Sequence, residues 1–209
     1  MPLEIWIAFA LASTALLTIP GPTVMLVVSY ALRHGRASGW ATVPGVSLGD
    51  LTAMTVSLAG AGAVLAASAQ LFTVLKLCGA AYLIWLGVKL WRAVPESLEM
   101  APVRGGSGAF RPMFWNAYVV TALNPKSIVF FIAFVPQFVS VQAPLVPQFA
   151  ILIATFVGLA AINTVVWVLL VGEMRRRIGR PGVLRWMNRT GAGFLIGAGL
   201  LTAFARRSA

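Results

Sequence analysis

The sequence is poor in the side chains that carry most redox and metal chemistry in proteins. Its 209 residues include one cysteine, Cys78, and one histidine, His34. A single thiol excludes an intrachain disulfide, a dithiol relay and a thiolate metal cluster. A lone histidine in a basic loop is more typical of a solvated side chain than of a metal ligand. We therefore expect neither a metal nor a cofactor, and no enzyme activity that depends on them.

Charged residues are also scarce. They make up 10% of the chain, whereas a typical soluble domain has about 25%. Hydrophobic residues make up 59%, and the mean hydropathy is +0.89. The apolar runs are continuous and do not alternate with polar residues as the strands of a membrane barrel would. The composition predicts an all-α integral membrane protein in a lipid bilayer, with one membrane domain over residues 1–209.

Acidic residues are the rarest charged class. There are 5 of them against 16 lysines and arginines, which gives a formal net charge of +11. Such an excess can indicate nucleic-acid binding. Here most basic residues lie in short loops beside apolar segments, where they determine membrane orientation. We expect no nucleic-acid partner.

Six apolar segments are long enough to cross the hydrocarbon core, which takes about 20 residues. The predicted spans cover residues 5–32, 40–67, 71–91, 112–138, 147–171 and 186–204. The first segment lacks the basic start and small-residue cleavage pattern of a signal peptide, so we expect it to remain as a helix.

Basic residues are distributed unevenly between the expected loops. The first, third and fifth loops, with their flanks, carry twelve lysines and arginines, and the second and fourth carry none. Cytoplasmic loops are enriched in these residues. The pattern predicts that the odd loops are cytoplasmic and that both termini lie outside. Arg206 and Arg207 oppose this orientation but are outnumbered.

The third loop resembles a linker between two related halves. Residues 93–110 contain Pro95, Pro102 and the run Gly105–Gly108 without apolar periodicity. The halves, 1–92 and 111–209, share two sequence matches in the same order: 79–87 with 191–199, and 18–22 with 121–125. Three spans in each half would make the repeat inverted in the membrane, with a substrate site where the repeats meet. The alternative is that Gly/Ala/Leu-rich helices match by composition.

The first segment contains Pro20-Gly21-Pro22, flanked by Thr18 and Thr23. Proline removes a helical hydrogen bond and clashes with the preceding turn. Exposed backbone is tolerated at membrane depth only inside protein or beside a water-filled cavity. We predict a broken helix whose second part begins near Pro22 and directs free N–H groups toward an anionic group such as a carboxylate. A purely structural kink is the alternative.

Ionisable residues inside the predicted spans are Asp50, Lys76 and Lys126. A charge in the bilayer is costly, so such residues usually face the protein interior and are functional. Asp50 is a candidate site for a coupling proton or for a substrate ammonium, or else forms a structural ion pair with Lys126 or Lys76. Lys126 follows Asn124-Pro125, a predicted break in the fourth span, and is a candidate partner for a substrate carboxylate. Lys76 and Asn163 are secondary candidates.

Two pairs of glycines have the spacing that lets membrane helices pack closely. Gly45 and Gly49 precede Asp50, and Gly193 and Gly197 repeat the spacing in the last span. We expect both pairs to lie at helix–helix contacts and not to bind ligand.

Taken together, the motifs resemble the lysine/threonine exporter family of the LysE/RhtB type over nearly the whole chain. The resemblance rests on Pro20-Gly21-Pro22, Gly45 with Gly49-Asp50, Lys76 with 79–87, and Asn124-Pro125-Lys126, in that order. It implies an exporter of amino acids or their derivatives in the bacterial inner membrane, driven by the proton-motive force. A related branch that moves electrons through paired cysteines does not fit a single Cys78, and a cadmium-exporting branch does not fit the lack of thiol and histidine clusters.

These observations predict a secondary transporter with six membrane helices in two inverted three-helix repeats, the first and fourth helices being broken. Its expected ligands are a small zwitterionic amino acid and a proton, and a homodimer is an allowed assembly. A membrane protein with a structural or assembly role and no transport is the alternative.

Overall fold

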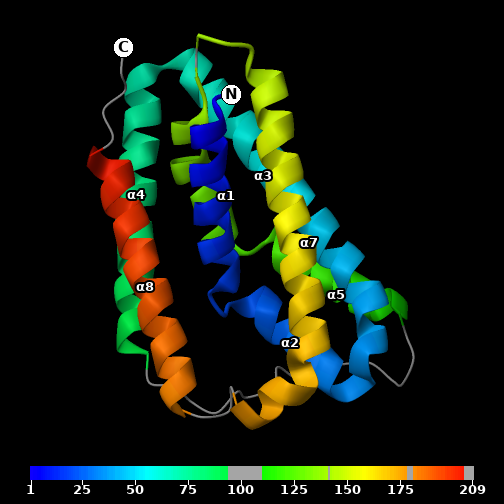
Figure 1. Ribbon diagram of the computed structural model, residues 1–209. Helices are drawn as coiled ribbons and strands as arrows, with labels where there is room; N and C mark the ends of the chain where they lie inside the picture. Colours follow the sequence, from blue (N-terminus) through cyan, green and yellow to red (C-terminus); the bar gives the residue numbers. More distant parts are fainter. Residues whose placement is uncertain (94–109, 141, 178–180, 205–209) are drawn as a thin grey trace.

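The computed structural model describes residues 1–93, 110–140, 142–177 and 181–204, and the described chain is almost entirely helical (Figure 1). The longer helices run roughly along a common direction, as expected for a membrane bundle. The elements are α1 (Leu3–Thr18), α2 (Pro22–His34), η1 (Gly35–Ser38), α3 (Gly39–Ala67), α4 (Ala69–Arg92), α5 (Phe110–Ala122), α6 (Pro125–Val129), η2 (Phe130–Phe134), η3 (Val135–Phe138), α7 (Leu145–Arg177) and α8 (Pro181–Phe204).

The first apolar segment is interrupted at its two prolines. Helix α1 ends at Thr18, and α2 begins at Pro22, which takes a first-turn position as expected. The helical stretches Leu3–Thr18 and Pro22–Val64 are bent by 57° at this interruption. The bend follows from proline chemistry, because neither Pro20 nor Pro22 can donate the hydrogen bond that a continuous helix needs.

The fourth apolar segment is irregular in two places. Helix α5 ends at Ala122, and α6 begins at Pro125 with Asn124 as its N-cap residue. The chain then continues as a single π-helical stretch, η2, and a short 3-10 turn, η3. Such π-helical turns are uncommon and are found mostly near functional sites.

Length and hydropathy select three of the described helical stretches as membrane spans: Thr73–Arg92, Phe110–Phe138 and Leu145–Leu170. The bent pair at the first interruption raises this number to four if it is counted as one span. The predicted second and sixth spans are helical and correspond to α3 and α8. By the same criteria α3 counts only as part of the bent pair, and α8 is not selected as a span. The protein is thus an all-helical membrane protein, and the count of six spans stays a prediction. Most of the predicted linker, residues 94–109, lies outside the described residues.

Helices α4 and α8 pack against each other, and two glycines make their contact close (Figure 1). A Cβ atom added at Gly87 would lie 2.9 Å from the carbonyl oxygen of Ala192, and one at Gly199 would lie 2.8 Å from that of Ala80. The sequence match of 79–87 with 191–199 pairs Gly87 with Gly199 and Ala80 with Ala192. The contact is therefore reciprocal: the glycine of each helix lies against the matching alanine of the other helix.

One glycine pair behaves as expected and the other does not. Cβ atoms at Gly45 and Gly49 would lie 2.6 Å and 2.8 Å from the carbonyl oxygens of Phe114 and Tyr118, so both glycines allow α3 to approach α5 closely. The prediction for Gly193 and Gly197 is wrong, because a Cβ there would meet nothing within 4 Å. The sequence spacing of small residues does not reveal which helix face is covered.

The core lies where α1, α3, α7 and the π-helical stretch meet. Phe130 and Phe131 of η2 are fully buried and contact Phe156 of α7, with ring centroids 6.3 Å and 4.8 Å apart. Phe9 of α1 is also fully buried and packs edge-on against Phe138. These aromatic contacts fix η2 between helices of both sequence halves and so position α6, which precedes it.

Candidate functional site

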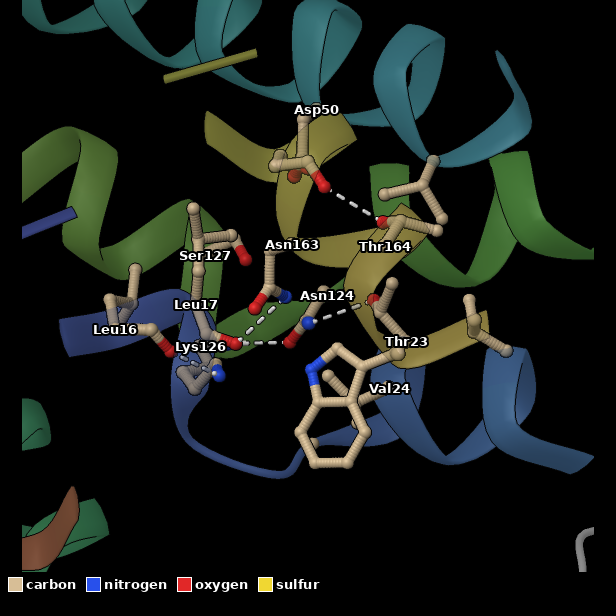
Figure 2. Close-up of a pocket in the computed structure, with 15 residues that line it drawn as sticks. Leu16, Leu17, Thr23, Val24, Asp50, Asn124, Lys126, Ser127, Asn163 and Thr164 are labelled. Carbon is tan, nitrogen blue, oxygen red and sulfur yellow. Dashed lines mark hydrogen bonds between the residues drawn. The ribbon is translucent and has the colours of Figure 1, made fainter. Parts of the chain in front are cut away.

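A small cavity lies beside the interruption between α1 and α2, bordered by α3, α6 and α7 (Figure 2). Its volume is about 30 Å³, which holds about two water molecules. It is lined by Leu16, Leu17, Gly21, Thr23, Val24, Val27, Val46, Asp50, Asn124, Lys126, Ser127, Ala160, Asn163, Thr164 and Trp167.

Three carbonyl groups at the first interruption accept hydrogen bonds from side chains in the second half of the chain, and one of them, that of Leu16, also accepts from the backbone N–H of Ile19 at 3.3 Å. In an unbroken helix, the carbonyls of Leu16, Leu17 and Ile19 would accept from residues 20, 21 and 23. Here the Lys126 ammonium donates to the oxygens of Leu16 and Ile19, both at 3.1 Å. The Asn163 amide donates to Leu17 at 3.2 Å (Figure 2). The break is therefore completed by residues more than 100 positions away.

The second interruption contacts the first one directly. Asn124 caps α6, because its side-chain oxygen accepts from the backbone N–H of Lys126 at 3.1 Å. Its amide nitrogen donates to the Thr23 hydroxyl at 3.3 Å, and the Thr121 hydroxyl donates to the same oxygen at 3.2 Å. Thr23 lies in the first turn of α2, so the two predicted breaks meet through its side chain.

The start of α2 faces the cavity with a helix N-terminus and a lysine beside it. Backbone N–H groups in a first turn have no partner within the helix, and they carry a partial positive charge. Gly21 lies beside the lysine, since a Cβ there would be 3.4 Å from the Lys126 nitrogen, an ordinary contact distance. This side of the cavity is therefore suited to an anionic group.

Asp50 occupies the opposite side of the cavity on α3, and its side chain is only 3% exposed (Figure 2). No nitrogen of Lys126 comes within the 4.0 Å of an ion pair with the Asp50 carboxyl group. Lys126 instead contacts the end of α1. The two charged groups thus line one cavity from opposite sides.

The remaining predicted residues are placed differently. Asn163 lines the cavity, whereas Lys76 on α4 does not. Pro20 and Pro22 shape the interruption without lining the cavity. Thr18 bonds within its own helix, where its hydroxyl donates to the carbonyl of Thr14.

Sequence reasoning missed the contribution of α7 beyond Asn163. Thr164 and Trp167 also line the cavity and are 3% and 7% exposed. The available signal was helical spacing, because Trp167 lies four positions after Asn163 and three after Thr164, and residues at these spacings are neighbours on a helix surface. Within the described residues, no group of three or more His, Cys, Asp or Glu side chains could hold a metal ion.

Comparison with known proteins identifies the family to which this arrangement belongs. Residues 14–206 match the family model described as LysE type translocator. The chain belongs to this family. Its members are translocators, so the protein is a transporter and not an enzyme, and a purely structural or assembly role is disfavoured.

Several curated relatives extend over the whole chain. A homoserine/homoserine lactone efflux protein of Salmonella typhi is 31% identical over 212 residues, covering 100% of both chains. A membrane protein of Vibrio cholerae serotype O1 is 30% identical over 210 residues, covering 99% of this chain and 100% of that protein. A leucine efflux protein of Enterobacter sp. strain 638 is 30% identical over 142 residues, which are 68% of this chain and 66% of that protein. No solved structure is significantly similar.

Proposed function

We propose that the protein exports amino acids or closely related zwitterions across the bacterial inner membrane in exchange for protons. The observation that carries this proposal is the placement of opposite charges on two sides of one cavity, with Asp50 on one side and Lys126 beside the α2 N-terminus on the other. A zwitterionic amino acid carries the two complementary charges close together. The names of the Salmonella and Enterobacter relatives, both amino-acid efflux proteins, support the same substrate class.

In this mechanism, the carboxylate of the substrate binds at the interruption of α1 and α2. The first-turn N–H groups of α2 and the Lys126 ammonium supply the positive charge. Asn124 holds the geometry of this region through its bonds to Lys126 and Thr23. The Thr23 hydroxyl is a further hydrogen-bonding group within reach of the cavity.

Asp50 provides the coupling to protons in this mechanism. A single carboxyl group binds either a proton or the substrate ammonium but not both at once. Exchange of substrate for a proton at the outer side, and of a proton for substrate at the inner side, then gives antiport. The absence of an Asp50–Lys126 ion pair within 4.0 Å supports this role, because the carboxyl group is not committed to an internal partner.

Six spans in two inverted repeats provide the movement. The reciprocal contact of Gly87 and Gly199 supports an antiparallel relationship between α4 and α8, as an inverted repeat requires. A cavity of about 30 Å³ is too small for an amino acid, so the helices around it must separate to admit one.

The test is export from cells that lack competing exporters and are loaded with amino-acid dipeptides. Asp50→Asn should abolish export above background while the protein reaches the membrane in normal amount. Glu4→Gln, which changes an exposed acid in the first turn of α1, is the matched control and should export normally. Export by Asp50→Asn at the rate of the unaltered protein would remove Asp50 from the mechanism.

A further inference from the structure

One wall of the cavity is apolar. It is formed by Val24 and Val27 of α2, Val46 of α3, and Ala160 and Trp167 of α7. All five side chains are between 1% and 8% exposed. Apart from Ala160, they belong to one packed hydrophobic cluster, so the wall joins side chains of three helices.

The charges that line the cavity are one of each sign. Asp50 and Lys126 are the acidic and basic side chains among the lining residues in the described part of the chain. The ammonium and carboxylate groups common to all amino acids would occupy both of these charged side chains, Asp50 and Lys126. A further charge on the substrate side chain would lose its hydration against the apolar wall without gaining a partner, which is unfavourable.

We propose that this wall is the side-chain subsite, that it selects neutral aliphatic amino acids over basic and acidic ones, and that Trp167 sets the largest side chain accepted. The inference rests on the proposed function, because it assigns the substrate class of the same cavity. Trp167 is the bulkiest lining residue, and it lies one turn from Asn163 on α7. Because Asn163 is held by the Leu17 carbonyl, the position of the indole is fixed relative to the interruption.

The first test compares export of leucine, lysine and glutamate by the unaltered protein in cells loaded with the corresponding dipeptides. Leucine export should exceed lysine and glutamate export by at least about tenfold, the discrimination expected when a buried charge is left unpaired. Lysine or glutamate export at the rate of leucine would overturn the inference and leave amino-acid export standing. Export of no amino acid would instead refute the proposed function.

The second test changes the size of the subsite. Trp167→Ala should raise the ratio of phenylalanine to valine export by about tenfold, because the shortened side chain opens space beside the wall. A ratio measured within one variant does not depend on how much protein reaches the membrane. Trp40→Ala is the matched control, since Trp40 on α3 is 81% exposed, and its ratio should stay at the wild-type value.

Trp167→Phe covers the case in which the alanine variant does not reach the membrane. It retains an aromatic wall of smaller volume and should shift the same ratio in the same direction by a smaller factor. An unchanged ratio in a Trp167 variant that reaches the membrane, or an equal change in Trp40→Ala, would overturn the assignment of Trp167.

Discussion

Lys126 is a partly buried cation whose ammonium group donates to main-chain carbonyl oxygens. Its ammonium group binds Leu16 and Ile19 at the C-terminal end of α1, where the helix dipole places a partial negative charge. The ammonium therefore binds carbonyl groups where the regular hydrogen-bonding pattern of α1 ends. A carboxylate partner is not required for its burial, which explains how Asp50 can line the same cavity unpaired.

Asn124 has two separable effects, one as a helix cap and one as a link to Thr23. Asn124→Ala should lower the free energy of unfolding by about 0.5–2 kcal/mol through loss of the cap. It should also reduce export, because the amide no longer holds the start of α2. The free energy of unfolding is measured by thermal unfolding of the purified variant in detergent. Export is measured in dipeptide-loaded cells that express the same variant.

The control for this prediction is Ser68→Ala, which removes the cap of α4. It should produce a similar loss of stability and leave export unchanged. Equal loss of export in the two variants would mean that Asn124 acts through stability alone.

Some of the residues that line the cavity can be identified from the sequence as candidate site residues, and others cannot. Asp50, Lys126 and Asn124 stand out because polar groups in a membrane span are expensive and few. Thr164 and Trp167 do not, since threonine bonds its own helix and tryptophan packs in most apolar helices. Their role depends on which face of α7 meets the interruption, and that face is set by contacts distant in sequence.

At the scale of elements, the two interruptions are predictable because proline acts locally. The prolines at 20, 22 and 125 fix where helices end and begin, and the structure begins α2 and α6 at Pro22 and Pro125. The direction of the chain after each break is not local. At the first break it depends on the side chains that bind the carbonyls there, and these come from the other half of the sequence.

The contact between α4 and α8 makes a prediction about helix packing. Gly87→Ala places a methyl group against Ala192 and Ile196, and Gly199→Ala places one against Ala80 and Ile84. Each should lower the free energy of unfolding by about 1–3 kcal/mol, as overpacked contacts do. Thermal unfolding in detergent measures both.

Gly197→Ala is the control for this pair, because a Cβ at that position meets nothing within 4 Å. It should be neutral or stabilise α8 by up to about 1 kcal/mol, since alanine favours the helix. Equal destabilisation by Gly197→Ala would show that the reciprocal contact does not hold the two helices.

At the scale of the whole molecule, orientation is the strongest untested prediction. In a Cys78→Ala background, Ala37→Cys and Ala143→Cys place single thiols at exposed positions in the first and fourth expected loops. A membrane-impermeant maleimide applied to intact cells should label the cysteine at 143. It should label the one at 37 only after the membrane is opened, and the reverse pattern would contradict the expected orientation.

The bonds from Lys126 to α1 also have a consequence for biosynthesis. The chain is made from its N-terminus, and Lys126 follows Leu16 by 110 residues. During translation the carbonyls of the first interruption must therefore wait for the fourth apolar segment before they receive these partners. Until then α1 and α2 depend on water or the insertion machinery for those hydrogen bonds. The first half of the chain by itself therefore lacks the side chain that binds these carbonyls in the finished fold.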